Sequence, residues 1–180
     1  MVQIDTKHEY VNGRKVYIFV AKDVKTRISF TFAYDRLNSK NAKDFLEKLI
    51  KAIPFEIKGI QTDNGSEFLG EFSKALKKKE IKHYFNYTRY SKVQAYVERM
   101  NRTLQDEFVM YYENYELEDV YEFNRKMIKI YAMDNTERPH HSLNKKSPME
   151  FFCDIINSSK SEFSQTGMTY TFQILTKFKN

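Results

Sequence analysis

Residues 2–34 read VQIDTKHEYVNGRKVYIFVAKDVKTRISFTFAY, and this stretch decides the fold of the chain. Residues 2–10 and 15–24 are rich in β-branched and aromatic side chains, which pack well in strands. Asn12 and Gly13 lie between them and readily adopt the two positive φ angles of a tight hairpin turn. The stretch therefore predicts two antiparallel strands joined as a hairpin.

Residues 27–34 predict a third antiparallel strand, because large apolar side chains occupy every second position along them. Ser39 is then expected to cap a helix, whose apolar residues recur at helical spacing until Pro54 stops it. The elements expected next are a strand at residues 57–62, a helix around residues 68–76, a strand at residues 81–87 and then further helices.

The expected order of elements limits the possible folds. A strand–helix–strand unit within one sheet is normally parallel and right-handed, whereas strands joined by a hairpin are antiparallel. We therefore expect an α/β domain with a mixed five-stranded sheet flanked by helices. Few common folds have this order, and the ribonuclease H-like fold is one of them.

Length and composition indicate one globular domain. The chain has 180 residues, enough for one full core, and its 41% hydrophobic content is too high for a disordered chain. A net charge of +6 favours an anionic partner without identifying it. The single cysteine, Cys153, excludes an intrachain disulfide and a multi-cysteine zinc site. No apolar run reaches the roughly 18 residues of a membrane span, and no signal peptide is evident, so we expect a soluble cytoplasmic protein.

The compact domain is expected to span residues 1–152. Residues 153–180 form a C-terminal extension that begins as a polar, loop-like stretch. Within it, residues 168–178 alternate weakly, as a strand does. The pattern leaves open whether this segment pairs with the sheet edge, with another subunit or with nothing.

Two aspartates fall where ligand sites form in α/β proteins. Asp5 is expected near the end of the first strand and Asp63 at the C-terminal end of the fourth, where loops can direct side chains into a crevice. Gly65 is expected to let the backbone turn sharply after Asp63. On their own, Asp63, Asn64 and Gly65 are more often a plain turn than a catalytic site.

Residues 93–108 predict an amphipathic helix. One apolar stripe contains Val93, Val97, Met100, Leu104 and Phe108, which are spaced by three or four residues. The adjoining polar face carries Gln94, Glu98, Asn101, Arg102 and Gln105. This face is either solvated, with Glu98 paired to Arg102, or part of a site.

Four stretches, taken in order, resemble a known family. They are VQIDTK at residues 2–7, QTDNGSEF at 61–68, AYVERMNRTLQDEF at 95–108 and RPHHSLNKKSPMEFF at 138–152. Together they are similar to the integrase catalytic core of bacterial insertion-sequence transposases and retroviral integrases. The resemblance covers roughly residues 1–152, and the 35 positions from Asp63 to Glu98 are close to the spacing of that family's Asp-Asp-Glu triad.

The resemblance implies that Asp5, Asp63 and Glu98 are catalytic and bind two divalent ions, Mg²⁺ or Mn²⁺. Physical chemistry agrees, because three converging carboxylates repel one another unless a cation neutralises them. Hard oxygen ligands select these ions, and the lack of a Cys/His cluster disfavours zinc. Two such ions can activate the attacking oxygen and stabilise the leaving one during displacement at phosphorus.

The implied reaction has two steps. Water hydrolyses a phosphodiester at the element end and frees a 3′-hydroxyl, which then attacks a phosphodiester of target DNA. Two alternatives remain open: a ribonuclease H-like nuclease without strand transfer, and a non-enzymatic DNA-binding remnant of a transposase. The resemblance also implies a homodimer or higher oligomer, associated with the nucleoid of a bacterium.

Several polar residues are expected to contact DNA. The set proposed from the sequence is Asn64, Lys92, Gln94, Arg99, Asn101 and Arg102. A separate cluster of Lys77, Lys78, Lys79 and Lys82 can neutralise phosphates or form a solvated face.

Other features are expected to be structural or depart from the family. We expect His8 and His83 to be structural. Residues 138–143 resemble the family's Arg-Pro-His segment, and we expect them to pack the last helix. The loop at residues 90–95 lacks the family's usual Pro and Asn or Gly, and Asp134 replaces the usual Tyr before Asn135. Asp5 lies so near residue 1 that we expect no end-binding helix-turn-helix domain in this chain.

Overall fold

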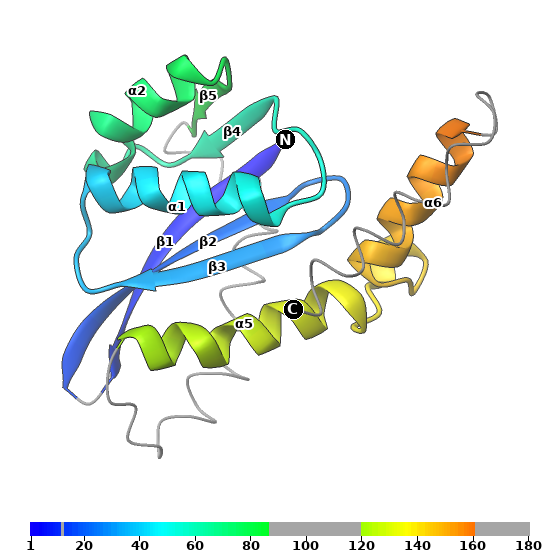
Figure 1. Cartoon of the computed structure of the whole chain (residues 1–180), viewed down its shortest axis with the longest axis horizontal. Coiled ribbons are helices and arrows are strands. Elements are labelled where there is room, and N and C mark those ends of the chain that lie inside the picture. The colour runs from blue at the N-terminus through cyan, green and yellow to red at the C-terminus, as the bar shows by residue number, and fades with distance from the viewer. Residues whose placement is uncertain (12, 87–119, 161–180) are drawn as a thin grey trace.

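The computed structural model describes residues 1–11, 13–86 and 120–160. Its central element is a mixed five-stranded sheet (Figure 1). The strand order is β3-β2-β1-β4-β5. The strands are β1 (Val2–Val11), β2 (Arg14–Asp23), β3 (Ser29–Tyr34), β4 (Gly59–Thr62) and β5 (Lys82–Phe85). Neighbours β1, β2 and β3 are antiparallel, while β4 is parallel to both β1 and β5. The hairpin, the third strand and the mixed sheet that the sequence predicts are therefore confirmed.

The helices follow the expected order. They are α1 (Ser39–Ala52), the 3₁₀ turn η1 (Ser66–Phe68), α2 (Glu71–Lys78), α5 (Val120–Thr136), the 3₁₀ turn η4 (His141–Leu143) and α6 (Pro148–Lys160). The second helix expected from the sequence is divided into η1 and α2. Gly70, with a positive φ of 58°, lies at this division, where glycine tolerates a backbone that side chains disfavour. In the part of the chain that the structure describes, no helix is long and apolar enough to cross a membrane.

The cap of α1 differs from the sequence prediction. Asn38 is the N-cap, and its side-chain oxygen accepts a hydrogen bond of 2.8 Å from the backbone N–H of Asn41. Ser39 is the first helical residue instead. Its hydroxyl accepts a hydrogen bond of 3.1 Å from the Phe72 N–H and donates to the Leu69 carbonyl, so Ser39 ties α1 to the start of α2.

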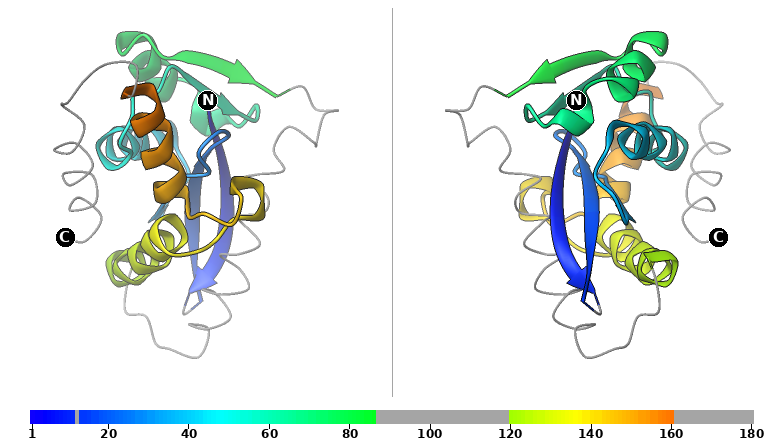
Figure 2. Two further views of the ribbon diagram at one scale, coloured as in Figure 1. Left: turned by 90° about the vertical axis from the view of Figure 1, so that its right-hand side faces the viewer. Right: turned by 90° about the vertical axis from the view of Figure 1, so that its left-hand side faces the viewer.

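The hydrophobic core lies between the sheet and α1. The Phe19 ring of β2 contacts Phe45 of α1 and Phe68 of η1, with ring centroids 5.3 and 6.2 Å apart. Phe30 of β3 also packs on Phe45, at 5.5 Å. Burying each such aromatic side chain contributes about 1.5–3 kcal/mol. Figure 2 shows α1 and α5 on the same side of β1 and β2. The other face carries Gln3 and Lys7 of β1 together with the buried Ile18 and Val20 of β2.

Helix α5 closes the free edge of β3 with two asparagines. Asn124 accepts from the Ala33 N–H at 2.7 Å and donates to the Ala33 carbonyl at 2.9 Å. Asn135 makes the same pair of hydrogen bonds with Ser29, both at 2.8 Å. Eleven residues are close to three helical turns, so both asparagines face the strand. We call the contact made by these four residues the β3–α5 seam.

Helix α6 continues past the boundary expected after residue 152. It runs from Pro148 to Lys160, so that boundary falls inside the helix. Phe152 is buried against the ring of Phe55, with centroids 5.6 Å apart, and Ile156 packs against the core from beyond the boundary. Residues 161–180, including the weakly alternating stretch, lie outside the described residues.

Candidate active site

Asp5 lies on β1, and Asp63 directly follows β4, the strand paired with β1. In the parallel pair β1–β4, Val2 is opposite Ile60 and Gln3 is opposite Gln61. Continuing this register by two residues brings Asp5 opposite Asp63. Side chains two residues apart share a face, and the Gln3–Gln61 hydrogen bond of 3.1 Å marks that face. Ile4 and Phe19 fill the opposite face beneath α1, so Asp5 lies on the face of Gln3 and Gln61, and Asp63 follows the end of β4 directly.

The location of Asp5 corrects the sequence prediction. Asp5 lies in the first half of β1, which continues to Val11, and not near the strand end. What ends near Asp5 is the pairing with β4, whose last paired residue is Gln61. Beyond that point β1 pairs only with β2 among the described strands, because the hairpin is longer than β4. The carboxylate therefore still lies where two parallel strands separate.

The Asp63 carboxylate is held by the loop that follows β4. The Gly65 N–H donates to Asp63 Oδ1 at 3.0 Å, while Oδ2 makes no hydrogen bond with a described residue. The Asp63 carbonyl accepts from the Thr62 hydroxyl at 2.7 Å, and this hydroxyl lies 2.9 Å from His83 Nε2. His83 is therefore structural, as expected, and burial lowers the pKa of its imidazole. One Asp63 oxygen is fixed and the other is available to a ligand.

Gly65 has a different role from the one expected. Its φ of −59° and ψ of 139° are open to any residue, so no special backbone conformation requires glycine here. Space is the constraint here instead, because a Cβ would lie 2.5 Å from Oε2 of Glu67 and would displace the Glu67 carboxylate. Glu67 is only 6% exposed, and its Oε1 accepts a hydrogen bond of 2.8 Å from the Thr6 hydroxyl. The sequence analysis did not single out Glu67, although a carboxylate four residues after Asp63 was a visible signal.

The remaining site residues divide into one that is described and six that are not. Asn64 is exposed, and its Nδ2 donates to the Asn86 carbonyl at 3.3 Å, which joins the β4 loop to the end of β5. Glu98 and the DNA-contact set of Lys92, Gln94, Arg99, Asn101 and Arg102 lie outside the described residues. The described residues alone contain no group of three His, Cys, Asp or Glu side chains that could hold a metal ion. Asp5, Asp63 and Asn64 are thus the described members of the predicted site.

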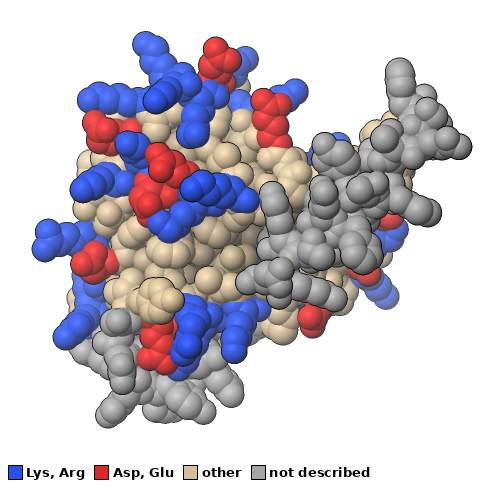
Figure 3. Space-filling model, viewed as in Figure 1, with Lys and Arg blue, Asp and Glu red and all other residues tan. Residues whose placement is uncertain are grey.

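The face over α1 and α2 carries mixed charges (Figure 3). Lys77, Lys78, Lys79 and Lys82 are all exposed there. The acidic residues Glu71 and Glu80 lie among them, and Lys74 pairs with Glu71 at 3.1 Å. Interspersed charges of this kind are typical of a solvated surface.

Family models match almost the whole described domain. One model of the integrase core domain matches residues 1–91, and a second matches residues 79–148. The chain belongs to the integrase core domain family. A putative integrase of Spiroplasma virus SpV1-C74 is 29% identical to this integrase core over 172 residues, which cover 84% of this chain. The chain spans only 47% of that relative's length.

Solved structures show the same fold at low sequence identity. The chain is similar to a chain of the simian T-cell lymphotropic virus intasome, whose structure was solved in complex with PP2A regulatory subunit B56 gamma. The TM-score is 0.71 and the sequence identity is 20%, and the match covers 83% of this chain and 52% of that one. The HTLV-2 integrase catalytic core in complex with magnesium gives a TM-score of 0.68 at 18% identity, and the match covers 83% of this chain and 93% of that one. The catalytic core domain of BIV integrase gives a TM-score of 0.66 at 16% identity, and the match covers 90% of this chain and 98% of that one. The ribonuclease H-like fold is thereby confirmed.

The Arg-Pro-His segment of this integrase core surrounds a buried carboxylate. Asp134, only 2% exposed, lies 3.7 Å from Lys22 Nζ, and 3.6 Å from both Arg138 Nε and His140 Nε2. Burial opposes ionisation of Asp134, but these basic groups outweigh it and hold its pKa below 3.8. Burial lowers the pKa of Lys22, against the attraction of Asp134. The segment therefore packs the end of α5 against β2, as a structural role requires.

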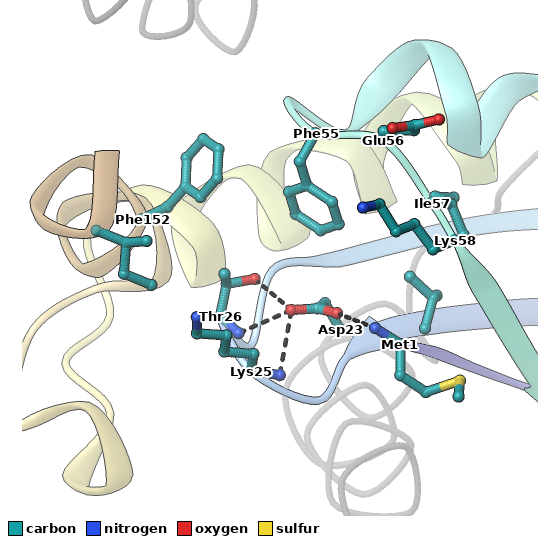
Figure 4. Close-up of a pocket in the computed structure, with 11 residues that line it drawn as sticks. Met1, Asp23, Lys25, Thr26, Phe55, Glu56, Ile57, Lys58 and Phe152 are labelled. Carbon is teal, nitrogen blue, oxygen red and sulfur yellow. Dashed lines mark hydrogen bonds and ion pairs between the residues drawn. The ribbon is translucent and has the colours of Figure 1, made fainter. Parts of the chain in front are cut away.

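A cavity of about 410 Å³ lies away from the two aspartates (Figure 4). It is lined by Phe55, Phe152 and other residues near the end of β2, and Asp23 is its buried carboxylate. Asp23 accepts hydrogen bonds from the Thr26 N–H at 2.8 Å, the Thr26 hydroxyl at 2.9 Å and the Lys25 N–H at 3.1 Å. These bonds fix a turn, so Asp23 is structural and the cavity is not the candidate active site.

Proposed function

We propose that this integrase core is the catalytic domain of a DNA transposase or integrase, a polynucleotidyl transferase. It hydrolyses a phosphodiester at an element end and transfers the freed strand into target DNA. The observation that supports the proposal is the parallel pairing of β1 and β4, with Asp5 two residues after the pair Gln3–Gln61 on β1 and Asp63 two residues after it on the other segment. Membership of the integrase core domain family supports it further.

The donor set fits a divalent metal ion. Asp5 and Asp63 are half-buried carboxylates, hard oxygen donors of the kind that Mg²⁺ and Mn²⁺ prefer. Glu98 is proposed as the third ligand on the resemblance and its spacing from Asp63. The similarity to an HTLV-2 core with magnesium supports the same choice of metal. Two such ions, when bound, supply an activated nucleophile and charge neutralisation at the leaving oxygen.

The chain's own residues position the reacting groups. Asp5 is held on a ten-residue strand that is paired on both sides up to Gln3, two residues before it, and Asp63 is held by the Gly65 N–H. Elements of this kind keep ligands in place more precisely than long loops do. The same pair can serve hydrolysis and strand transfer, because only the nucleophile changes, from water to a 3′-hydroxyl.

DNA and a second copy of the chain are the proposed partners. Asn64, at the rim of the Asp63 loop, and the five polar residues proposed between positions 92 and 102 would hold the DNA backbone. Retroviral cores similar to this chain form dimers and trimers, and one is part of an intasome. Joining two element ends in one complex requires such an assembly.

The test is a strand-transfer assay. The purified protein is incubated with Mn²⁺, a plasmid target and duplex DNA that carries the element end with its 3′-hydroxyl exposed. We expect joined products with the wild type, a loss of at least about a hundredfold with Asp63→Asn, and no loss with Asp35→Asn, a matched change of an exposed aspartate. Joining that survives Asp63→Asn would refute the metal site. Cleavage without joining would favour the nuclease alternative.

A further inference from the structure

Glu67 is a buried carboxylate next to the proposed site that the chemistry above does not use. It lies in η1, four residues after Asp63, and is 6% exposed. Its hydrogen-bond partner among the described residues is the Thr6 hydroxyl, and none of their basic side chains forms an ion pair with it. Burying a carboxylate is costly unless its oxygens are hydrogen-bonded, and the Thr6 hydroxyl supplies such a bond.

Glu67 contacts both chain segments that carry the proposed ligands. Thr6, which donates to Glu67 Oε1, immediately follows Asp5 on β1. On the other side, the carboxylate folds back over Gly65 and occupies the space that a side chain would need, within 2.8 Å of an added Cβ. The Gly65 N–H in turn donates to Asp63 Oδ1. One side chain therefore connects the neighbour of Asp5 to the loop that orients Asp63.

We infer that Glu67 is a positioning residue that keeps the Asp5 and Asp63 carboxylates at a fixed separation. Thr6 lies on the α1 side of the sheet, opposite Phe19, and Glu67 binds it there, whereas Asp5 lies on the other face of β1. Glu67 therefore acts through the backbone and does not bind the metal ion. The inference rests on the proposed function, in which the two aspartates share that ion. Groups that orient ligands in this way typically change metal affinity by about 10–100-fold when removed.

The test uses two pairs of variants and two measurements. Thr6→Val and Glu67→Ala remove the hydrogen bond, while Thr6→Ser and Glu67→Gln keep a donor and an acceptor. Thr31→Val is the matched control, because it removes a buried hydroxyl that has no hydrogen-bond partner among the described residues. The Mn²⁺ dissociation constant is measured by electron paramagnetic resonance, and exchange of the Gly65 amide hydrogen is measured by NMR without metal.

We expect Thr6→Val and Glu67→Ala each to weaken Mn²⁺ binding about tenfold and to speed Gly65 exchange by a similar factor. Thr6→Ser and Glu67→Gln are expected to stay within about threefold of the wild type, and Thr31→Val to match it. Gly65→Ala should behave like Glu67→Ala, because the added methyl group displaces the carboxylate from Thr6. Added to Glu67→Ala, it should have little further effect.

Two results separate the inference from the proposal beneath it. If Thr6→Val and Glu67→Ala only lower the unfolding temperature, and leave both Mn²⁺ affinity and Gly65 exchange at the control level, Glu67 is merely structural and the inference is overturned. If the wild type binds no Mn²⁺, the proposed metal site fails. Gly65 exchange then still decides whether Glu67 fixes the Asp63 loop.

Discussion

The Asp5–Asp63 pair and the β3–α5 seam are both polar, yet they use their oxygen atoms differently. At the seam, the side-chain amides of Asn124 and Asn135 each accept from and donate to one backbone unit of β3. At the aspartate pair, Asp63 Oδ2 has no hydrogen-bond partner among the described residues, and the two carboxylates carry the same charge. The seam stabilises the fold, whereas the pair is proposed to share a cation.

The difference shows how buried polar groups can be sorted. At the seam, the hydrogen-bond donors and acceptors of each asparagine bind backbone groups of the edge strand. Such side chains close a sheet edge and prevent it from pairing with another strand. A pair of like charges on adjacent strands has no such structural use, and it marks a candidate site. Substitutions in the two regions should therefore have opposite effects on stability and activity.

The largest effect on stability is expected at the seam. Asn135→Ala leaves the N–H and carbonyl of Ser29 buried without partners, which should lower the free energy of unfolding by roughly 3 kcal/mol. Asn157→Ala, a matched change at an exposed position of α6, should have little effect. Urea denaturation measures both. A loss below about 1 kcal/mol at Asn135 would mean that the seam is not stabilised by these bonds.

An acid-dependent loss of stability is expected at Asp134. Its pKa in the folded state lies below 3.8, so its contribution is present above that value and is lost as the pH falls through the folded-state pKa. Asp134→Asn should therefore be less stable than the wild type at pH 6, and the difference should shrink as the pH falls below about 4. Denaturation at a series of pH values measures this. A difference that stays constant would show that the Asp134 charge contributes nothing.

The smallest effect is expected at the aspartate pair, and its sign is reversed. Asp63→Asn removes the repulsion with Asp5 but keeps an oxygen for the Gly65 N–H, so without metal it should raise stability by about 0.5 kcal/mol. Added Mn²⁺ should stabilise the wild type and not the variant. Thermal unfolding with and without Mn²⁺ tests both points. Equal stabilisation of the two proteins by Mn²⁺ would place the ion elsewhere.

Much of the fold could be predicted from local patterns. Asn12 and Gly13 indicated the hairpin, and alternation along residues 27–34 indicated β3, because both signals depend on neighbouring residues only. The cap of α1 was assigned one residue too late, since Asn38 and Ser39 are both common N-cap residues. The spacing of Asn124 and Asn135 was visible, but nothing local shows that a helix will lie along the edge of a strand.

The candidate site was less predictable, because it depends on register. Asp5 and Asp63 were predicted to lie near the ends of the first and fourth strands, but that these two strands are neighbours follows only from pairs such as Gln3 with Gln61. The role of Gly65 was assigned to backbone freedom, whereas the Glu67 carboxylate fills its Cβ position. Contacts of that kind join residues that the sequence gives no reason to connect, such as Thr6 and Glu67.

The most direct measurement is anomalous X-ray diffraction from crystals of this integrase core grown with Mn²⁺. The account predicts a manganese peak in contact with carboxylate oxygens of both Asp5 and Asp63, and its absence in the Asp63→Asn variant. If saturating Mn²⁺ produces no peak between these two side chains, or if the carboxylates lie on opposite faces of the sheet, the shared metal site does not exist.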